Sequence, residues 1–515
     1  MKKFLTSLIV LILVLSCSVA IFAACDDEGG GSGGGSAAYN KTIYFYSSQG
    51  QSLTPITETA IQKFQAKYPG WTVVHTTQGG YDDVKDKILG DLQAGQQPDV
   101  AYCYADHVAS YLETGKVVNI KDLLNSTATV KGNVVELNDD DEWVATGETK
   151  DYAVGYDYTN IVSGYYEEGK AINFANYARY GYQRDDILTL PFSKSTELLY
   201  YNEDALKAAG IVDKDGNAKP AETWDELWAH CKIIKDKWGN AVTPLGYDSE
   251  ANWFITMCQQ NGWPYTTANG LDQYLFAHKE ARDWLNQLRE YFLKGYFATQ
   301  DTNGGYTSGL FTLGVGQLNG VEADQGGAVY CIGSSAGASK QVSTSGKWKV
   351  GIAQIPGSIQ YDEDGNELYD DDGDLVVNRS CISQGPSLVM FKGGRGVTNA
   401  DEKVKMTFLF VQELLDAEFQ ADFSIGSGYN PAVETAFQVP KYINHLNGSD
   451  NTAVAAKMAR SLSSFFFTSP AFDGSSTART QVGNALIYAI KGEKSATDAL
   501  RDAYRNCSGK ESTLQ

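Results

Sequence analysis

The sequence predicts an α/β fold, with mainly parallel sheets covered by helices. Three observations lead to this prediction. Short runs rich in β-forming residues alternate with segments whose apolar residues have helical spacing. The alternation returns in the second half of the chain and ends in helices. The 515 residues, 43% of them hydrophobic, are sufficient for two large lobes with separate cores.

The first part of the chain reads as strand, helix, strand, helix, strand. Thr42–Tyr46 is a run of β formers that ends at a Ser-Ser-Gln-Gly turn. Pro55–Tyr68 has apolar residues at helical spacing, and Trp71–Thr76 again resembles a strand. Val84–Leu92 predicts a second helix and Asp99–Tyr104 a third strand. Such an order is typical of parallel strands with crossover helices.

The pattern continues after an irregular stretch. Residues 127–188 contain many Tyr and Gly with little periodicity, so we expect a long excursion from the first lobe. Residues 359–375 are acidic and contain glycine, which predicts an exposed loop or hairpin. Further strands and helices are expected at Leu198–Tyr201, Asp225–Lys235, Ala328–Ile332, Ser387–Phe391, Lys403–Leu415, Val482–Ala489 and Ala496–Tyr504.

The N-terminus has the features of a lipoprotein signal. Lys2 and Lys3 precede an apolar run centred on Leu8–Leu15, and Phe22-Ala-Ala-Cys25 resembles the bacterial lipobox. We therefore predict a signal peptide over 1–24 and lipidation of Cys25. Cys17 is a competing site with a poorer match, and an ordinary cleaved signal is the alternative.

A flexible tether is expected to follow. Residues 25–38 begin with Cys-Asp-Asp-Glu and continue with Gly and Ser, a composition that behaves as a flexible coil. No later apolar run reaches the roughly 18 residues that a membrane span needs. The chain is thus expected to lie outside the cytoplasm, held at the outer face of the cell membrane by its lipid alone.

Charge and cysteine content exclude some functions. The chain has 42 Lys+Arg against 63 Asp+Glu, a formal net charge of −21, so phosphate backbones would repel it and no nucleic-acid partner is expected. The cysteines after Cys25 form no CxxC pair and specify no disulfide. Several stand in apolar stretches, which favours a role as small core residues.

Four motifs occur in order along the chain. They are Leu92-Gln-Ala-Gly95-Gln-Gln-Pro98-Asp99-Val100 with Asp106 and Tyr111–Gly115; Leu190-Pro191 through Leu198–Asn202, Ala209-Gly210 and Thr223–Leu227; Gly326–Val329; and Gly428–Pro431. Together they resemble the extracellular solute-binding proteins of ABC sugar importers, the family that includes maltose-binding protein. They occur in family order and cover most of residues 40–505. The ordered set, rather than any single motif, carries the resemblance.

The resemblance implies a two-lobed periplasmic-binding-protein fold of type II, with a ligand cleft between the lobes. The first lobe would comprise 39–189 and 356–425, with 127–188 as its insertion. The second would comprise 190–355 and 426–510. Leu190-Pro191 and Gln354–Gly357 would be the hinge crossings, because Pro and Gly suit segments that absorb a backbone change in few residues.

A sugar site needs aromatic rings for the apolar face of the sugar and carboxylates or amides for its hydroxyl edge. The resemblance places several such residues at the cleft. Asp106 follows the third strand and would accept hydroxyl groups, or cap a helix. Trp253 would stack on the ring, or pack in the core. The full set of expected ligand-binding residues is Gln49, Tyr104, Asp106, Glu197, Asp248, Asn252, Trp253, Ser334, Ser335, Gln384 and Tyr429.

The sequence also contains patterns that resemble a catalytic site and calcium loops. Gly333–Gly337 fits the G-x-S-x-G pattern of a hydrolase, with His445 the one histidine after it. A weak following helix and a Gly/Ser-rich composition argue against it. Asp213–Asn217 and Asp362–Asn366 resemble the start of a calcium loop but lack the glutamate at position twelve, so acidic surface turns are expected. No cofactor or metal is predicted, and a glycosidase is the enzyme alternative.

The combined prediction is a monomeric, lipid-anchored binding component of an ABC importer. It would capture a mono- or oligosaccharide between its lobes and deliver it to the permease subunits. A non-sugar solute, such as a polyol phosphate or a peptide, is the alternative ligand. A basic cleft would favour phosphate, whereas the segments expected at the cleft are acidic and aromatic, which favours a neutral sugar.

Overall fold

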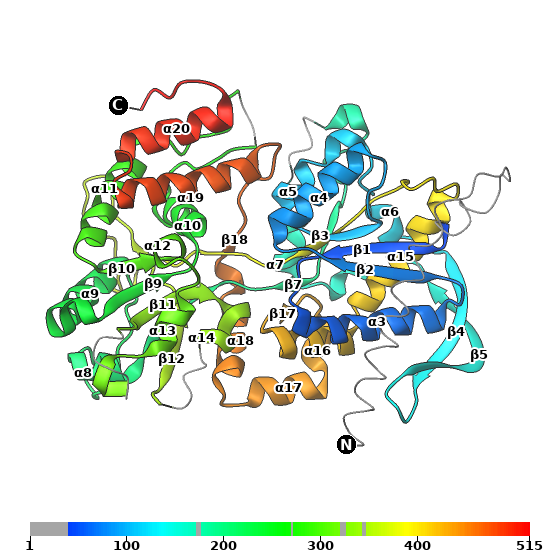
Figure 1. The fold of residues 1–515 in the computed structure, drawn as a ribbon, viewed down its shortest axis with the longest axis horizontal. Helices are drawn as coiled ribbons and strands as arrows, with labels where there is room; N and C mark the ends of the chain where they lie inside the picture. Colours follow the sequence, from blue (N-terminus) through cyan, green and yellow to red (C-terminus); the bar gives the residue numbers. More distant parts are fainter. Residues whose placement is uncertain are drawn as a thin grey trace, which may run out of the picture.

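The computed structural model describes residues 40–170, 172, 177–268, 271–319, 326–341 and 347–514. Two lobes lie side by side, each built around a five-stranded sheet with helices on its faces (Figure 1). The predicted signal peptide, Cys25 and tether lie outside the described residues. Within the described part, none of the helices has the length and apolar character that a membrane crossing requires.

The first lobe contains the sheet β2-β1-β3-β16-β6. Its strands are β1 (Thr42–Ser47), β2 (Thr72–Thr77), β3 (Val100–Cys103), β6 (Thr189–Pro191) and β16 (Ser387–Met390). β1 runs parallel to β2 and β3, whereas β16 runs antiparallel to β3 and β6. The main covering helices are α3 (Thr54–Lys67), α4 (Tyr81–Gln93) and α15 (Ala400–Leu414). The ring of Phe410 lies 5.8 Å from that of Phe45 and 5.5 Å from that of Phe64, which joins sheet and helices in one core.

The second lobe contains the sheet β10-β9-β11-β8-β12. Its strands are β8 (Glu197–Asn202), β9 (Thr243–Tyr247), β10 (Phe297–Thr299), β11 (Ala328–Ser334) and β12 (Val350–Gln354). β9 is parallel to β10 and β11, and β8 is antiparallel to β11 and β12. The main helices are α9 (Trp224–Trp238), α10 (Glu250–Asn261), α11 (Lys279–Leu293), α19 (Ser475–Lys491) and α20 (Ala496–Ser508). The predicted α/β class with two lobes is confirmed. Each sheet is mixed rather than mainly parallel, because two of its four strand pairings are antiparallel.

Shorter elements complete the fold. The helices are α5 (Ala105–Ala109), α6 (Lys121–Leu124), α7 (Ser163–Tyr166), α8 (Glu203–Ala209), α12 (Gln300–Asn303), α13 (Ser308–Leu313), α14 (Ala338–Gln341), α16 (Ala417–Ser427), α17 (Pro440–Asn447) and α18 (Asn451–Ser461). The strands are β4 (Thr129–Leu137), β5 (Trp143–Ala153), β7 (Ser193–Lys194), β13 (Ser358–Ile359), β14 (Val377–Asn378), β15 (Cys381–Ile382), β17 (Asn430–Pro431) and β18 (Phe466–Phe467).

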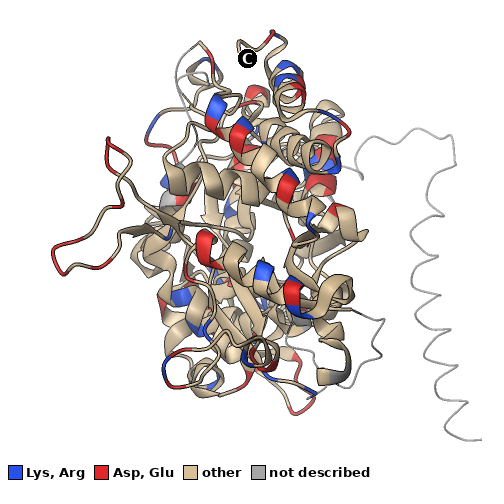
Figure 2. Cartoon of the chain, turned by 90° about the vertical axis from the view of Figure 1, so that its left-hand side faces the viewer, with Lys and Arg blue, Asp and Glu red and all other residues tan. Residues whose placement is uncertain are grey.

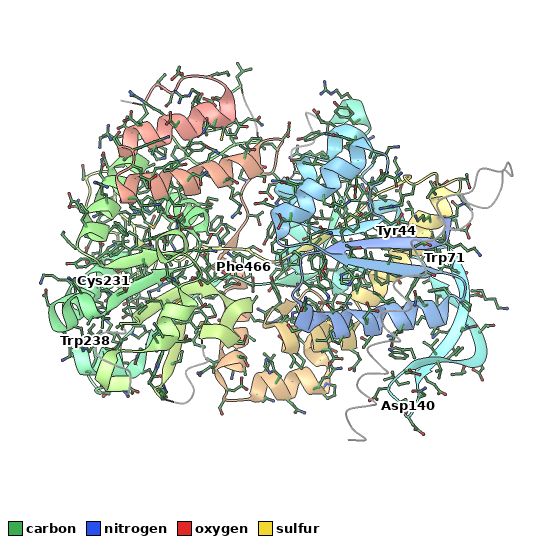
Figure 3. The ribbon with its side chains drawn as sticks, viewed as in Figure 1. Tyr44, Trp71, Asp140, Cys231, Trp238 and Phe466 are labelled. Carbon is green, nitrogen blue, oxygen red and sulfur yellow. The ribbon has the colours of Figure 1, made fainter. Side chains whose placement is uncertain are left out.

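The excursion 127–188 is more regular than its sequence suggests. Its first half is the antiparallel hairpin β4–β5, which packs on α3 through an edge contact of 5.8 Å between the rings of Tyr152 and Tyr68. The hairpin lies on the outer flank of the first lobe, with Asp140 at its tip (Figure 3). Most of its side chains face solvent, so the strands lack the apolar alternation that would have predicted them. The second half of the excursion packs against the first lobe, where Ile172, Tyr177 and Tyr182 share a hydrophobic cluster with Val84 and Ile88.

The second crossing between the lobes comes later than Gln354–Gly357. After β12 the chain stays with the second lobe, because Gly357 forms a β-bridge with Thr223 and the following arm leads to β13 and β14. Cys381 and Ile382 belong to the hydrophobic core of the second lobe. The chain therefore crosses between β15 and β16, and the acidic arm between 358 and 378 belongs to the second lobe.

The crossing segments pair with one another. β7, on the first crossing, runs antiparallel to β17, and Ser195 bridges to Gln384 of the second crossing. Phe466 of β18 lies between the lobes and continues this junction by pairing with β15 (Figure 3). Short backbone pairings rather than a shared core therefore join the two lobes at this point.

Lys194 is the buried charge of this junction. Its side chain has no solvent exposure, and its ammonium group lies 2.8 Å from both carboxylate oxygens of Glu168. The same group donates to the carbonyl of Gly385 at 3.1 Å and to the hydroxyl of Ser387 at 3.2 Å. One cation thus holds the excursion and two crossing segments together.

We predict that Lys194→Met destabilises the protein by about 3–5 kcal/mol, because it leaves the Glu168 carboxylate buried without its cation. The double variant Lys194→Met/Glu168→Gln should recover a large part of this loss. Urea unfolding followed by tryptophan fluorescence measures both. Lys232→Met, which breaks an exposed pair with Asp236, is the matched control and should cost less than about 1 kcal/mol. A double variant no more stable than Lys194→Met would contradict the prediction.

Candidate ligand-binding site

A pocket of about 220 Å³ lies where the two lobes and the crossing segments meet. Its lining comes from the loop after β3, the excursion, α10, the second crossing, the segment after β18 and the start of α19. The lining residues are Tyr104, Ala105, Asp106, Glu168, Ser249, Asn252, Tyr265, Ile382, Ser383, Gln384, Thr468, Ser469, Pro470, Ser475 and Arg479. Hydroxyl, amide and carboxylate groups dominate this set.

Asp106 and Arg479 face each other across the pocket. Asp106 stands in α5, directly after β3 of the first lobe, whereas Arg479 stands in α19 of the second. The Nε atom of Arg479 lies 3.8 Å from Oδ2 of Asp106, and its Nη1 donates to Oδ1 of Asn252 at 2.6 Å. The alternative role of Asp106 as a helix cap is not observed, since Tyr104 holds the N-cap position.

A buried carboxyl lies behind Asn252. The Nδ2 group of Asn252 donates to Glu197 at 3.1 Å, and the hydroxyl of Tyr247 donates to the other carboxylate oxygen at 2.7 Å. Glu197 is 1% exposed, and desolvation raises its pKa to about 7 even though both hydrogen bonds act in the opposite direction. A hydrogen-bonded chain therefore runs from the pocket surface into the core of the second lobe.

The charges at the pocket compensate one another. Asp106 faces Arg479, and Glu168 is paired with Lys194 while also accepting from the hydroxyl of Ser383 at 3.2 Å. The charged residues of the lining together with Lys194 sum to zero. Such a pocket offers directed hydrogen bonds without a net field on the ligand.

Tyrosine rings contribute to the pocket from both lobes. Tyr104 lies 4.6 Å from Tyr81 between ring centroids, and the Tyr81 hydroxyl lies 3.1 Å from the hydroxyl of Tyr429. Tyr265 lines the pocket from the second lobe. These rings supply flat apolar area beside the polar groups, the combination that a sugar ring or a polyol backbone requires.

Four of the sequence-predicted residues meet at this pocket. They are Tyr104, Asp106, Asn252 and Gln384. Two further predicted residues contact the pocket only indirectly. The hydroxyl of Tyr429 contacts that of Tyr81, and Glu197 accepts a hydrogen bond from Asn252. The pocket thus combines residues from the first-lobe motif, α10 and the second crossing.

Other predicted residues bond within the protein and do not line this pocket. Gln49 accepts hydrogen bonds from Thr57 and Tyr102 inside the first lobe. The backbone N–H and the hydroxyl of Thr307 both donate to Asp248 at 2.6 Å. The hydroxyl of Ser334 donates to Ser195, and that of Ser335 accepts from the backbone of Thr196. These side chains hold loops and the first crossing in place.

Trp253 is a correction to the predicted site. Its ring has 0% exposure and belongs to the core of the second lobe. It stacks on Tyr247 at 4.5 Å and on Trp224 at 6.0 Å. Asn252 and Trp253 are adjacent on α10 but project to different surroundings, so the pocket receives the amide and the core receives the indole.

The hydrolase and calcium patterns have structural explanations. Ser335 of the G-x-S-x-G segment is buried and accepts a hydrogen bond from the backbone of Thr196, and among the described residues it has no hydrogen bond to a histidine ring. Asp213 and Asp362 accept backbone N–H groups within their own exposed turns. Over the described parts of the chain, no group of three or more His, Cys, Asp or Glu is placed to hold a metal.

Several pocket residues were not anticipated. Glu168 comes from the irregular excursion, Thr468–Pro470 from a loop after β18, and Arg479 from the part of α19 that precedes the predicted helix Val482–Ala489. Arg479 adds a basic group to a cleft whose segments were expected to be acidic and aromatic. No local motif marks these positions, since a helical Arg has the same sequence surroundings on a solvated face as in a cleft.

The sequence profile of the bacterial extracellular solute-binding proteins matches residues 59–447. The chain belongs to this family. Among curated relatives, the sn-glycerol-3-phosphate-binding periplasmic protein UgpB of Escherichia coli K12 is 22% identical over 412 residues, covering 78% of this chain and 76% of UgpB. The predicted family resemblance is confirmed.

Solved structures of solute-binding proteins share the fold. UgpB from Mycobacterium tuberculosis in complex with glycerophosphocholine has a TM-score of 0.64 at 16% identity, covering 91% of this chain and 98% of that one. The ABC substrate-binding protein Lmo0181 from Listeria monocytogenes in complex with cycloalternan has a TM-score of 0.63 at 14% identity, covering 91% and 98%. The two-lobed architecture of this solute-binding protein is thus a family property.

We predict that Trp253→Ala lowers the free energy of unfolding by about 3–5 kcal/mol, as expected for removal of a buried indole. Trp238→Ala, a half-buried change elsewhere in the second lobe, should have a smaller effect. Urea unfolding followed by circular dichroism tests the difference. A Trp253→Ala protein of unchanged stability would show that the ring does not support the core.

The raised pKa of Glu197 leads us to expect that the stability of the protein depends on pH. This pKa rises from the usual 4.5 to about 7 in the folded chain, so the folded state binds this proton more tightly than the unfolded state. The resulting stabilisation is complete below pH 4.5 and is lost as the pH rises through 7, on the order of 3 kcal/mol. Glu197→Gln should remove this loss. Urea unfolding of both proteins between pH 4.5 and 7.5 tests it, and a pH-independent difference between them would contradict it.

Proposed function

We propose that this solute-binding protein captures a neutral, polyhydroxylated solute, a mono- or oligosaccharide, and delivers it to the permease of an ABC importer. The observation that carries the proposal is the charge-compensated pocket between the lobes, with Tyr104 and Tyr265 beside Asp106, Asn252 and the surrounding hydroxyl groups. A neutral ligand satisfies these donors and acceptors without leaving an unpaired buried charge.

The two lobes would close on the ligand. Asp106 contributes from the first lobe and Asn252 from the second, so only the closed arrangement lets both contact one molecule. A ligand that binds this arrangement more tightly shifts the population toward it. The protein returns the solute unchanged, as binding proteins do, and works as a monomer attached to the outer face of the membrane through lipidated Cys25.

A polyol phosphate is the second candidate ligand. Arg479 supports a phosphate ligand, because its guanidinium group can separate from Asp106 and bind a phosphate in a bidentate geometry. The curated relative UgpB is named for binding sn-glycerol-3-phosphate. In this case Asp106 would repel the ligand, so the phosphate would have to reach Arg479 from the side that faces Ser475.

A thermal-shift screen tests these proposals, since a ligand that binds only the folded state raises the melting temperature. We predict that a sugar raises it and that Asp106→Asn weakens that sugar at least tenfold, because a charge-assisted hydrogen bond contributes about 1.5–3 kcal/mol. Asp122→Asn, on a surface helix, is the matched control.

The alternative gives a different pattern in the same screen. If glycerol 3-phosphate or its diesters bind instead, Arg479→Gln should abolish binding while Asp106→Asn should strengthen it. Conversion of an oligosaccharide to smaller products during incubation would contradict a binding function altogether.

A further inference from the structure

The second lobe contains another cavity, of about 210 Å³, that shares no lining residue with the pocket between the lobes. It lies between α9, α10, α11 and the first part of the acidic arm. Its lining residues are Trp224, Asp225, Trp228, Trp253, Met257, Asn261, Trp263, Trp284, Gln287, Gly357, Ser358, Ile359 and Tyr361. We call this cavity the tryptophan pocket.

The aromatic rings are fixed by contacts with one another. The ring of Trp253 lies 6.0 Å from that of Trp224 and 6.2 Å from that of Trp228, with interplanar angles of 26° to both. Trp284 packs edge-on against Trp253 at 6.0 Å and lies 6.5 Å from Trp263. Such a set of mutually packed indoles is rigid, so binding of a ligand would cost little side-chain entropy.

Part of the hydrogen-bond donors around the tryptophan pocket is used within the protein. Trp224 donates its indole N–H to Gln260 at 2.8 Å, and the Nδ2 group of Asn261 donates to the carbonyl of Met257 and to Ser358. Ser358 donates in turn to Gln260. Among the described residues, the buried indole N–H of Trp253 has no hydrogen-bond partner.

The polar group at the rim of the tryptophan pocket is an acceptor. Asp225 is exposed at the rim, and among the described residues its carboxylate has no hydrogen bond or ion pair. No Lys or Arg lines the tryptophan pocket. The neighbouring arm adds further negative charge through Asp362, Glu363, Asp364, Glu367, Asp370, Asp371, Asp372 and Asp374.

The acidic arm begins at the pocket entrance. Tyr361, which lines the pocket and is 52% exposed, immediately precedes the first acidic turn. In Figure 2 acidic residues, drawn red, mark the turns of a thin arm that stands out from the body of the chain, as expected for the exposed turns 362–366 and 370–374. Aromatic faces inside and carboxylates outside both attract positive charge.

We propose that the tryptophan pocket binds a small organic cation, an alkylated ammonium group such as a quaternary ammonium. Its methyl groups would contact the indole faces, its charge would interact with the ring quadrupoles, and Asp225 would balance it at the rim. The cavity volume of about 210 Å³ suits a group smaller than a drug-sized ligand, because pockets for drug-sized ligands measure about 300–1,000 Å³. This binding does not depend on which solute occupies the cleft.

Titration of the full chain with tetramethylammonium chloride and choline chloride, followed by tryptophan fluorescence, tests the proposal. We expect saturable quenching, absent with sodium chloride and with the neutral analogue 3,3-dimethylbutanol. Asp225→Asn and Tyr361→Ala, both at exposed positions that preserve folding, should each weaken binding about tenfold. Asp106→Asn, in the pocket between the lobes, is the matched control and should bind the cation unchanged.

Three results would overturn the proposal: no saturation with either cation, equal binding of the neutral analogue, or loss of cation binding in Asp106→Asn. The last result would place the cation between the lobes and would leave the proposed capture of a solute intact. Cosedimentation with phosphatidylcholine vesicles, compared with free choline, separates the two sources of this cation. Binding of either one, lost in Asp225→Asn, supports the site.

Discussion

The arrangement of the lobes depends on the contacts that the buried ammonium group of Lys194 makes. This group contacts Glu168 of the excursion and Gly385 and Ser387 of the second crossing, while Lys194 itself belongs to the first crossing. Three chain segments that are distant in sequence therefore converge on one buried cation. Because Glu168 and Gln384 also line the pocket, the shape of the pocket wall follows from this junction.

The same junction explains how the pocket can be polar without being charged. A buried carboxylate such as Glu168 is tolerated only with a partner, and Lys194 provides one from beneath the pocket wall. Asp106 and Arg479 achieve the same balance across the lobes, but at 3.8 Å and with partial exposure. The first pair is suited to hold the hinge, whereas the second can open or exchange its partner when a ligand enters.

Much of the fold was predictable from the sequence because it depends on local patterns. The alternation of β-rich runs with helical spacing located the first three strands, and Asp106 directly after one of them was placed correctly beside the pocket. The exposed hairpin β4–β5 and the late second crossing were not predictable, because solvent-facing strands and tertiary contacts leave no apolar periodicity.

The site was less predictable than the fold for a related reason. Arg479 reaches the pocket from α19, more than three hundred residues after Asp106, and only the packing of two lobes brings them together. Trp253 shows the opposite error. A Trp next to a polar residue on a helix has the same sequence signature whether it faces a ligand or a core, and here one position on the helix separates the two outcomes.

Trp253 also explains how the second lobe can contribute to two pockets of different character. Its ring forms part of the tryptophan pocket and stacks on Tyr247, whose hydroxyl binds Glu197 behind the pocket between the lobes. Apolar surface therefore faces one side of this layer and a hydrogen-bonded carboxyl the other. On the cleft side every lining charge has a partner, so the geometry of hydrogen bonds would decide which ligand binds. On the outer side, Asp225 has no ion-pair partner among the described residues, so the charge of the ligand would decide. The formal net charge of −21 strengthens the preference for a cation at low ionic strength.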